Sequence, residues 1–194
     1  QLFGYMRKYG WIAVLAVLAI VGGTAFSELR KAQTETAAQA AGDTILAALE
    51  IDDDEARAAA LSDIEATGGA AAITGLLAAA DLTETGDVDG AAAALEAVAL
   101  DDGSPQVYRD LATLKSVMVQ LDTLSVQDRR AILSGLAAAG STFRLVAKEQ
   151  LALIAVEAGE TDDAITQFVA IAQDAAVTGG LRDRAFTMIV ALGG

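Results

Sequence analysis

Residues 84–95 read Glu-Thr-Gly-Asp-Val-Asp-Gly-Ala-Ala-Ala-Ala-Leu, and residues 157–168, Glu-Ala-Gly-Glu-Thr-Asp-Asp-Ala-Ile-Thr-Gln-Phe, repeat the same order of residue types. In each copy a glycine lies between acidic residues, an alanine follows five positions later, and a bulky apolar residue follows four positions after that. Glycine readily takes the left-handed conformation that ends a helix, and acids favour the start of the next helix. The alanine then lets two helices approach closely. The pattern predicts two helical hairpins, whose turn and packing residues are Gly86, Ala91 and Leu95 in the first and Gly159, Ala164 and Phe168 in the second.

The composition around these hairpins predicts an all-α chain. A single proline, few aromatic residues and abundant Ala, Leu and Glu all favour helix. Ser104 is an expected N-cap with Pro105 as the first helical residue, and Ser125 with Asp128 is an expected capping box. Ser141 and Thr178 are further expected N-caps. We expect helices that cover residues 52–66, 70–85 and 87–100, that begin near 105, 125 and 161, and that cover 141–159 and 178–192.

The two glycine turns resemble those of the tetratricopeptide repeat, in which a helix pair turns on Gly followed by an acid and carries a small alanine. Their separation of 73 residues is close to two units of about 34 residues. Residues 107–138 are then the intervening hairpin, which lacks the glycine turn and is a degenerate copy. We expect its first helix to present one apolar face, formed by Leu111, Leu114, Val117, Met118 and Leu121. An ordinary alanine-rich helical bundle is the alternative.

Residues 9–27 contain no charged side chain, which predicts a transmembrane helix. At 1.5 Å per residue this segment is roughly 28 Å long, close to the hydrocarbon thickness of a bilayer. Two alternatives are a cleaved signal peptide, with Arg7 and Lys8 as its basic start, and a buried core helix. Small residues at helical spacing predict a face on which another membrane helix packs, although membrane helices are rich in such residues anyway. That face comprises Ala16, Ala19 and Gly23.

The predicted organisation is a membrane-flanking segment (1–8), the transmembrane helix (9–27), a helical stalk (28–50) and a helical-repeat domain (51–194). All 27 acidic residues but only 11 of the 13 basic ones follow residue 27, a net charge of −16. A surface of this charge repels nucleic acid and anionic lipid headgroups. The expected partners are therefore the bilayer itself and other membrane proteins. Basic residues flank the segment equally, so the charge pattern does not set its orientation.

The order of these parts resembles the ancillary Sec-translocon subunit family of bacterial inner membranes. The short pieces that carry this resemblance are the start of the span at residues 8–11, Tyr108-Arg-Asp-Leu-Ala112, Phe143-Arg-Leu-Val-Ala147 and Leu181-Arg-Asp-Arg-Ala185. The resemblance implies a single-pass inner-membrane protein with a cytoplasmic N-terminus and a periplasmic repeat domain. It also implies contact with the translocon or with newly exported chains.

The residue types exclude most catalytic chemistry. Without His or Cys there is no Ser-His-Asp triad, no imidazole base and no His- or Cys-ligated zinc. Residues 85–96 match a calcium loop in part, but the same acids serve the hairpin turn. We expect no enzyme activity, cofactor, metal or small-molecule substrate. A groove for a partner carboxylate is predicted from the repeat-start arginines, although such residues often pair with neighbouring acids on the surface. These arginines are Arg109, Arg144, Arg182 and Arg184.

The leading hypothesis is therefore a membrane-anchored interaction scaffold that uses its repeats for docking. The alternative is a structural accessory subunit of a large respiratory or photosynthetic membrane complex, in which the transmembrane helix makes the contact.

Overall fold

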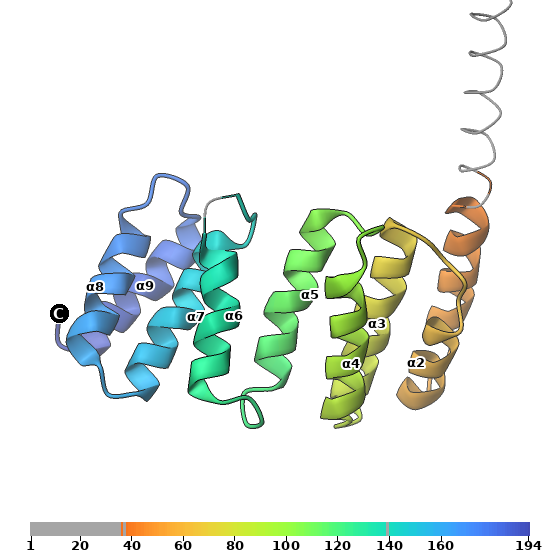
Figure 1. Cartoon of the computed structure of the whole chain (residues 1–194), viewed down its shortest axis with the longest axis horizontal. Helices are drawn as coiled ribbons and strands as arrows, with labels where there is room; N and C mark the ends of the chain where they lie inside the picture. The colour runs from red at the N-terminus through yellow and green to blue at the C-terminus, as the bar shows by residue number, and fades with distance from the viewer. Residues whose placement is uncertain (1–35, 37, 139) are drawn as a thin grey trace, which may run out of the picture. The chain divides into compact units, whose positions relative to one another are not determined.

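A computed structural model describes residues 36, 38–138 and 140–194 (Figure 1). The described residues divide into two units, one up to residue 46 and the other from residue 47 to 194. In the first unit the described residues, 36 and 38–46, are helical. The predicted transmembrane helix, with Ala16, Ala19 and Gly23, lies outside the described residues. Within the part of the chain that is described, no helix combines the length and the apolar character needed to cross a bilayer.

The second unit is a row of antiparallel helices that lie side by side in chain order (Figure 1). After a helical segment that ends at residue 49, the helices are α2 (Asp54–Ser62), α3 (Gly69–Glu84), α4 (Val88–Leu100), α5 (Gln106–Val119), α6 (Val126–Ala137), α7 (Arg144–Glu157), α8 (Thr161–Ala172) and α9 (Gly179–Ala191). The described residues contain no strand. The all-α prediction is thus confirmed for this part of the chain.

The apolar core is divided into three clusters, each shared by three successive helices. One joins α3, α4 and α5, the next joins α5, α6 and α7, and the last joins α7, α8 and α9. In the last cluster Phe168 and Ile171 are fully buried against alanines of the neighbouring helices. A core built from such local clusters is typical of a repeat stack, in which each hairpin contacts only its neighbours.

The hairpins α3–α4 and α7–α8 turn in the same way. Gly86 and Gly159 have φ angles of +82° and +76°, in the left-handed region. At the first turn the backbone N–H of Asp87 donates to Leu82 O at 2.8 Å, and at the second Glu160 donates to Ala155 O at 2.8 Å. The glycine N–H bonds the carbonyl three residues earlier in both turns. This pattern is the Schellman motif, which satisfies the last carbonyls of a helix.

The packing residues of these hairpins occupy equivalent places. Ala91 and Ala164 are fully buried, as are Leu95 and Phe168 one helical turn later. Alanine at this position brings the second helix close to the first, and the larger side chain fills the space beyond. The hairpin α5–α6 turns through residues 120–125, where the described backbone has no residue of positive φ.

Several predicted helix ends were wrong. Helix α2 ends at Ser62 rather than at residue 66, because residues 63–68 form the connection that crosses to α3. Pro105, not Ser104, is the N-cap residue of α5. Ser104 is instead buried, and its hydroxyl donates to Asp101 Oδ2 at 2.6 Å.

The remaining caps agree in part with the predictions. Ser125 accepts the N–H of Asp128 at 3.1 Å, but the Asp128 carboxylate accepts the Ser125 hydroxyl rather than its backbone N–H, so only half of a capping box forms. Thr178 caps α9 as predicted. Ser141 accepts the N–H of Phe143 just before α7 begins, and Phe143 is the N-cap residue.

The predicted apolar face of α5 is only partly buried. Leu114 and Val117 are buried against α6 and α7. Met118 and Leu121, in contrast, are 47% and 48% exposed. The prediction extended the face too far, because Leu121 lies beyond the end of α5 at Val119 and Met118, although inside the helix, is not part of the core cluster.

Candidate protein-binding surfaces

A groove follows helix α7, and we call it the α7 groove. One hollow of about 200 Å³ lies between α5, α6 and α7, and a second of about 470 Å³ lies between α7 and α9. Gln150 and Leu153 line both hollows, and Leu153 is 37% exposed. The apolar part of the lining includes Leu121 at one end and Met188 at the other. Exposed apolar groups beside amide and charged groups suit contact with a protein segment.

Two ion pairs fix the walls of the α7 groove. Arg129 Nη2 lies 2.6 Å from Glu157 Oε1, and this hydrogen bond raises the pKa of Arg129 and lowers that of Glu157. Arg184 donates to both oxygens of the buried Glu149, at 2.7 and 2.8 Å, and this raises the pKa of Arg184. A bidentate pair of this kind holds α9 against α7 in one orientation.

The arginines predicted to form a carboxylate-binding groove all have internal partners. Arg109 pairs with Asp102 at 2.7 Å, Arg144 binds both oxygens of Asp174 at 2.9 and 3.1 Å, and Arg184 binds Glu149. Arg182 Nε donates to the carbonyl of Ala172 at 3.2 Å. The structure brings Arg144 and Arg184 to one hollow of about 240 Å³ between α7 and α9, whereas Arg109 lies away on α5. Their role toward a partner carboxylate stays a prediction.

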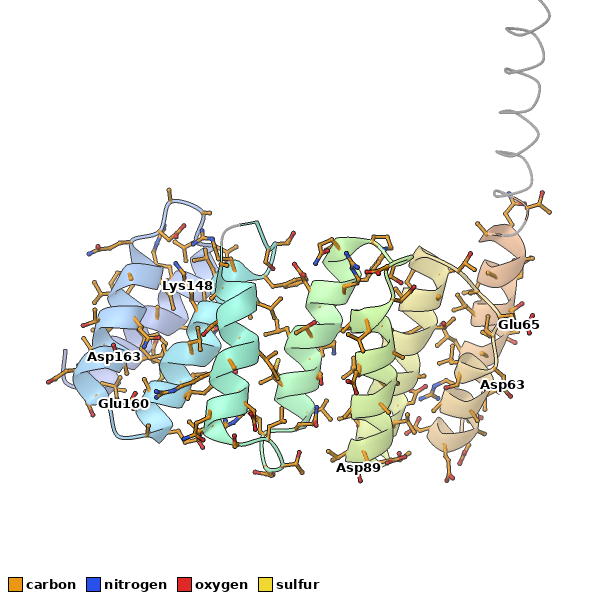
Figure 2. The ribbon with its side chains drawn as sticks, in the orientation of Figure 1. Asp63, Glu65, Asp89, Lys148, Glu160 and Asp163 are labelled. Carbon is orange, nitrogen blue, oxygen red and sulfur yellow. The ribbon has the colours of Figure 1, made fainter. Side chains whose placement is uncertain are left out.

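Ion pairs of this type neutralise most of the positive charge. Residues 38–194 hold 25 acidic and nine basic side chains. Six of those nine, all arginines, are in ion pairs: Arg57, Arg109, Arg129, Arg130, Arg144 and Arg184. Exposed acids such as Asp63, Asp89 and Asp163 therefore dominate the outside of the stack (Figure 2).

Sequence reasoning missed three buried acids that join neighbouring elements. Asp81 of α3 pairs with Arg57 of α2, and Glu149 of α7 pairs with Arg184 of α9. Asp110 of α5 accepts hydrogen bonds from Gln106 Nε2 at 2.6 Å and from Ser141 Oγ at 2.7 Å. A usable signal was present, because Glu149 stands at an apolar spacing between Val146 and Leu153.

The acids of residues 85–96 do not form a calcium loop. Val88 to Leu100 is helical, and the Asp87 carboxylate accepts the backbone N–H of Gly90 at 2.9 Å as a helix cap. Across the described residues, no group of three or more His, Cys, Asp or Glu side chains is placed to hold a metal ion.

The row of helical hairpins with local cores and repeated Schellman turns defines a helical-repeat protein. The family model of the tetratricopeptide repeat-like domain matches residues 4–178. The chain therefore belongs to this family, whose repeat domains are typical of non-enzymatic scaffolds for protein–protein interaction. Searches of the curated proteins and of the solved structures return no match.

Proposed function

We propose that this protein is a membrane-anchored docking scaffold of the bacterial inner membrane, with its repeat domain in the periplasm. The observation that carries the proposal is the helical-repeat stack with its exposed α7 groove. Such a stack binds partners through the shape and polarity of its surface, and this activity needs no reactive side chain. The uncharged segment at residues 9–27 is the proposed anchor.

The proposed partners are the Sec translocon or newly exported chains. The support for this step is the resemblance of the span, stalk and repeat phrases to the ancillary translocon subunits. The strong negative charge of residues 38–194 adds a second argument, because it turns the domain away from nucleic acid and anionic lipid and toward less acidic or basic protein surfaces.

A photo-crosslinking residue at position 153 tests the proposal in the native membrane. Leu153 lines both hollows of the α7 groove, so a docked partner comes within reach of the probe. The matched control places the same probe at position 96, an exposed site on α4 that lines neither hollow. We expect a discrete crosslinked partner from position 153 and none from position 96. Recovery of the uncrosslinked chain alone from both positions would refute the scaffold.

Exchange of residues 9–27 for an unrelated hydrophobic helix separates docking through the repeats from assembly through the span. A docking scaffold keeps its crosslink at position 153 after the exchange. A structural subunit held by its transmembrane helix loses it.

A further inference from the structure

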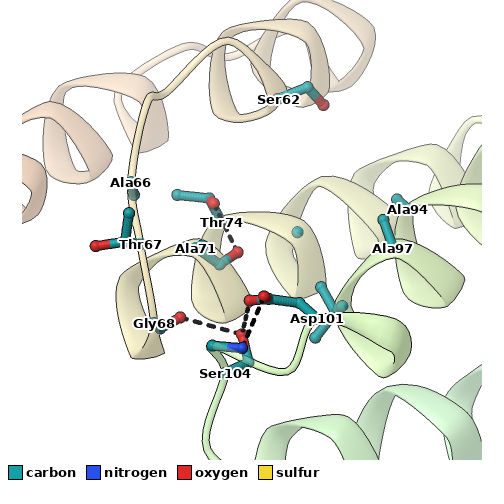
Figure 3. Close-up of a pocket in the computed structure, with 13 residues that line it drawn as sticks. Ser62, Ala66, Thr67, Gly68, Ala71, Thr74, Ala94, Ala97, Asp101 and Ser104 are labelled. Atoms are coloured by element: carbon teal, nitrogen blue, oxygen red, sulfur yellow. Dashed lines mark hydrogen bonds between the residues drawn. The ribbon is translucent and has the colours of Figure 1, made fainter.

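A separate hollow of about 600 Å³ lies between α2, α3 and α4 (Figure 3), and we call it the α2–α4 cleft. Its floor is made of small residues of α3 and its walls come from α2, from α4 and from the turn before α5. It exists because α2 ends at Ser62 and the chain crosses to α3 without a further helical turn. A volume of this size is in the range of ligand and peptide pockets. The cleft shares no lining residue with the α7 groove.

The side-chain hydroxyls of three residues that line the cleft donate their protons within the protein. Ser62 Oγ donates to Ala58 O at 2.8 Å and Thr74 Oγ1 donates to Ala71 O at 2.9 Å. Ser104 Oγ has its shorter contact, 2.6 Å, with Asp101 Oδ2, and it also lies 3.2 Å from Gly68 O (Figure 3). Because these three hydroxyl protons are already used, a ligand finds mainly hydrogen-bond acceptors here, on the Asp101 carboxylate and on backbone carbonyls.

The charge in the lining of the cleft is negative. Arg109, which lies outside the lining and pairs with Asp102, also acts electrostatically on the Asp101 carboxylate. The lining contains Asp101 and no Lys or Arg. Both flanking helices end at the cleft, and each has an aspartate at its C-cap, Asp63 for α2 and Asp101 for α4. Acid at a helix C-terminus is unfavourable, because the last carbonyls already carry partial negative charge. None of the other helices from α3 to α9 has an acidic C-cap.

Asp101 stays ionised at the mouth of the cleft. Hydrogen bonds from the Ser104 hydroxyl and from the backbone N–H of Gly103 lower the pKa of this carboxyl. Each oxygen accepts one of these bonds, Oδ1 from Gly103 at 2.9 Å and Oδ2 from Ser104 at 2.6 Å. A carboxylate has about four lone-pair sites, so each oxygen retains capacity for an incoming donor.

We propose that the α2–α4 cleft binds an arginine or lysine side chain of a partner protein segment, with the cationic head at Asp101 and the alkyl stem on the alanine-lined wall. Ala94 and Ala97 of α4 and Ala71 of α3 provide the apolar contact for the stem, as long basic side chains bury their methylene groups beside apolar surface. Charge complementarity selects this occupant. A second copy of the chain carries the same negative charge and is repelled.

This inference rests on the proposed function, because it states the chemistry of a partner that the scaffold recruits. The probe is a pair of short, dye-labelled, alanine-rich peptides that differ at one central residue, arginine in one and its uncharged isostere citrulline in the other. Their binding to the full chain in mild detergent is measured by fluorescence anisotropy, and the cleft residues are followed by NMR. We expect the arginine peptide to bind in the cleft, and we expect its affinity to fall as the salt concentration is raised.

Two variants and one control locate the binding. Asp101→Asn removes the charge and keeps one acceptor oxygen, and Ala97→Trp fills the cleft from an exposed position on α4. Either change is expected to weaken the binding of the arginine peptide at least about tenfold, since a charge-assisted hydrogen bond contributes about 1.5–3 kcal/mol. Glu96→Gln removes the same charge from an exposed position of α4 outside the cleft, and it should leave binding unchanged.

Equal binding of the arginine and citrulline peptides would overturn the proposal, as would no binding of either or equal binding to all variants. These results are distinct from failure of the scaffold itself. If the crosslink at position 153 survives in Ala97→Trp while the peptide results are negative, the cleft inference falls and the docking function stands. If the crosslink is absent from the wild-type chain, the docking function falls.

Discussion

The role of the repeated glycine turn can be tested by the substitution Gly159→Ala, which adds one methyl group at the turn. Gly159 has a φ of +76°, and a Cβ built on it meets no atom within 4 Å. The cost of Gly159→Ala is therefore conformational and not steric. The left-handed conformation costs an alanine roughly 1–2 kcal/mol, and the loss of freedom in the unfolded chain returns about 0.4–1 kcal/mol. We expect a net destabilisation of about 1 kcal/mol.

Gly135→Ala is the matched control because it adds the same methyl group at a helical position. Gly135 lies inside α6, and its Cβ likewise meets no atom within 4 Å. Alanine in a helix interior makes the folded protein more stable than glycine does, by about 0.5–1 kcal/mol. The same substitution is thus expected to destabilise the protein at position 159 and to stabilise it at position 135.

Urea unfolding of the full chain in mild detergent, followed by far-UV circular dichroism, measures both changes in the free energy of unfolding. The opposite signs are the decisive result. A neutral or stabilising Gly159→Ala would show that the turn tolerates a right-handed backbone and that the Schellman geometry does not set this hairpin.

Three further changes test the packing and the ion pairs. Phe168→Ala removes a fully buried side chain and should cost about 3–5 kcal/mol in urea unfolding. Arg184→Ala leaves the buried Glu149 without its counterion, so it should lower the melting temperature more than Glu149→Gln does. The reverse order of melting temperatures would contradict a stabilising role of this ion pair. Arg144 lowers the pKa of Asp174 to about 2; the native protein thus binds fewer protons than the unfolded chain as pH falls from 4 to 2. Wild type should lose stability across that window, and Asp174→Asn should lose less in melts at each pH.

The glycine turns were predictable from the sequence because their cause is local. Glycine at a left-handed position, an acid after it and an alanine five residues later act within one hairpin, and the structure shows the same backbone hydrogen bonds at Gly86 and Gly159. The end of α2 was not predictable in the same way. Residues 63–66 carry no strong stop signal, so the end of the helix depends on how the chain must cross to α3.

The partners of the buried acids Glu149 and Asp110 were beyond sequence reasoning, because they are distant along the chain. Glu149 and Arg184 are 35 residues apart, and Asp110 and Ser141 are 31 apart. An arginine near a repeat start suggests a free cation in the sequence, whereas the fold pairs Arg144 with Asp174 and Arg184 with Glu149, each about 30 residues or more away. The α2–α4 cleft was hidden for the same reason, since its lining comes from three helices and two loops.

The degenerate hairpin and the exposed apolar residues of α5 have a common origin. Helices α5 and α6 are the least closely packed of all successive pairs from α2 to α9, although Leu114 and Val117 of α5 share a core cluster with Leu133 of α6. The connection through residues 120–125 contains no glycine of positive φ, unlike the turns of α3–α4 and α7–α8. The space that remains becomes the first hollow of the α7 groove, with Leu121 and Leu133 in its lining. In a stack whose stability is a sum of neighbouring contacts, this sparsely packed interface contributes less to stability and leaves a surface that a partner segment can cover.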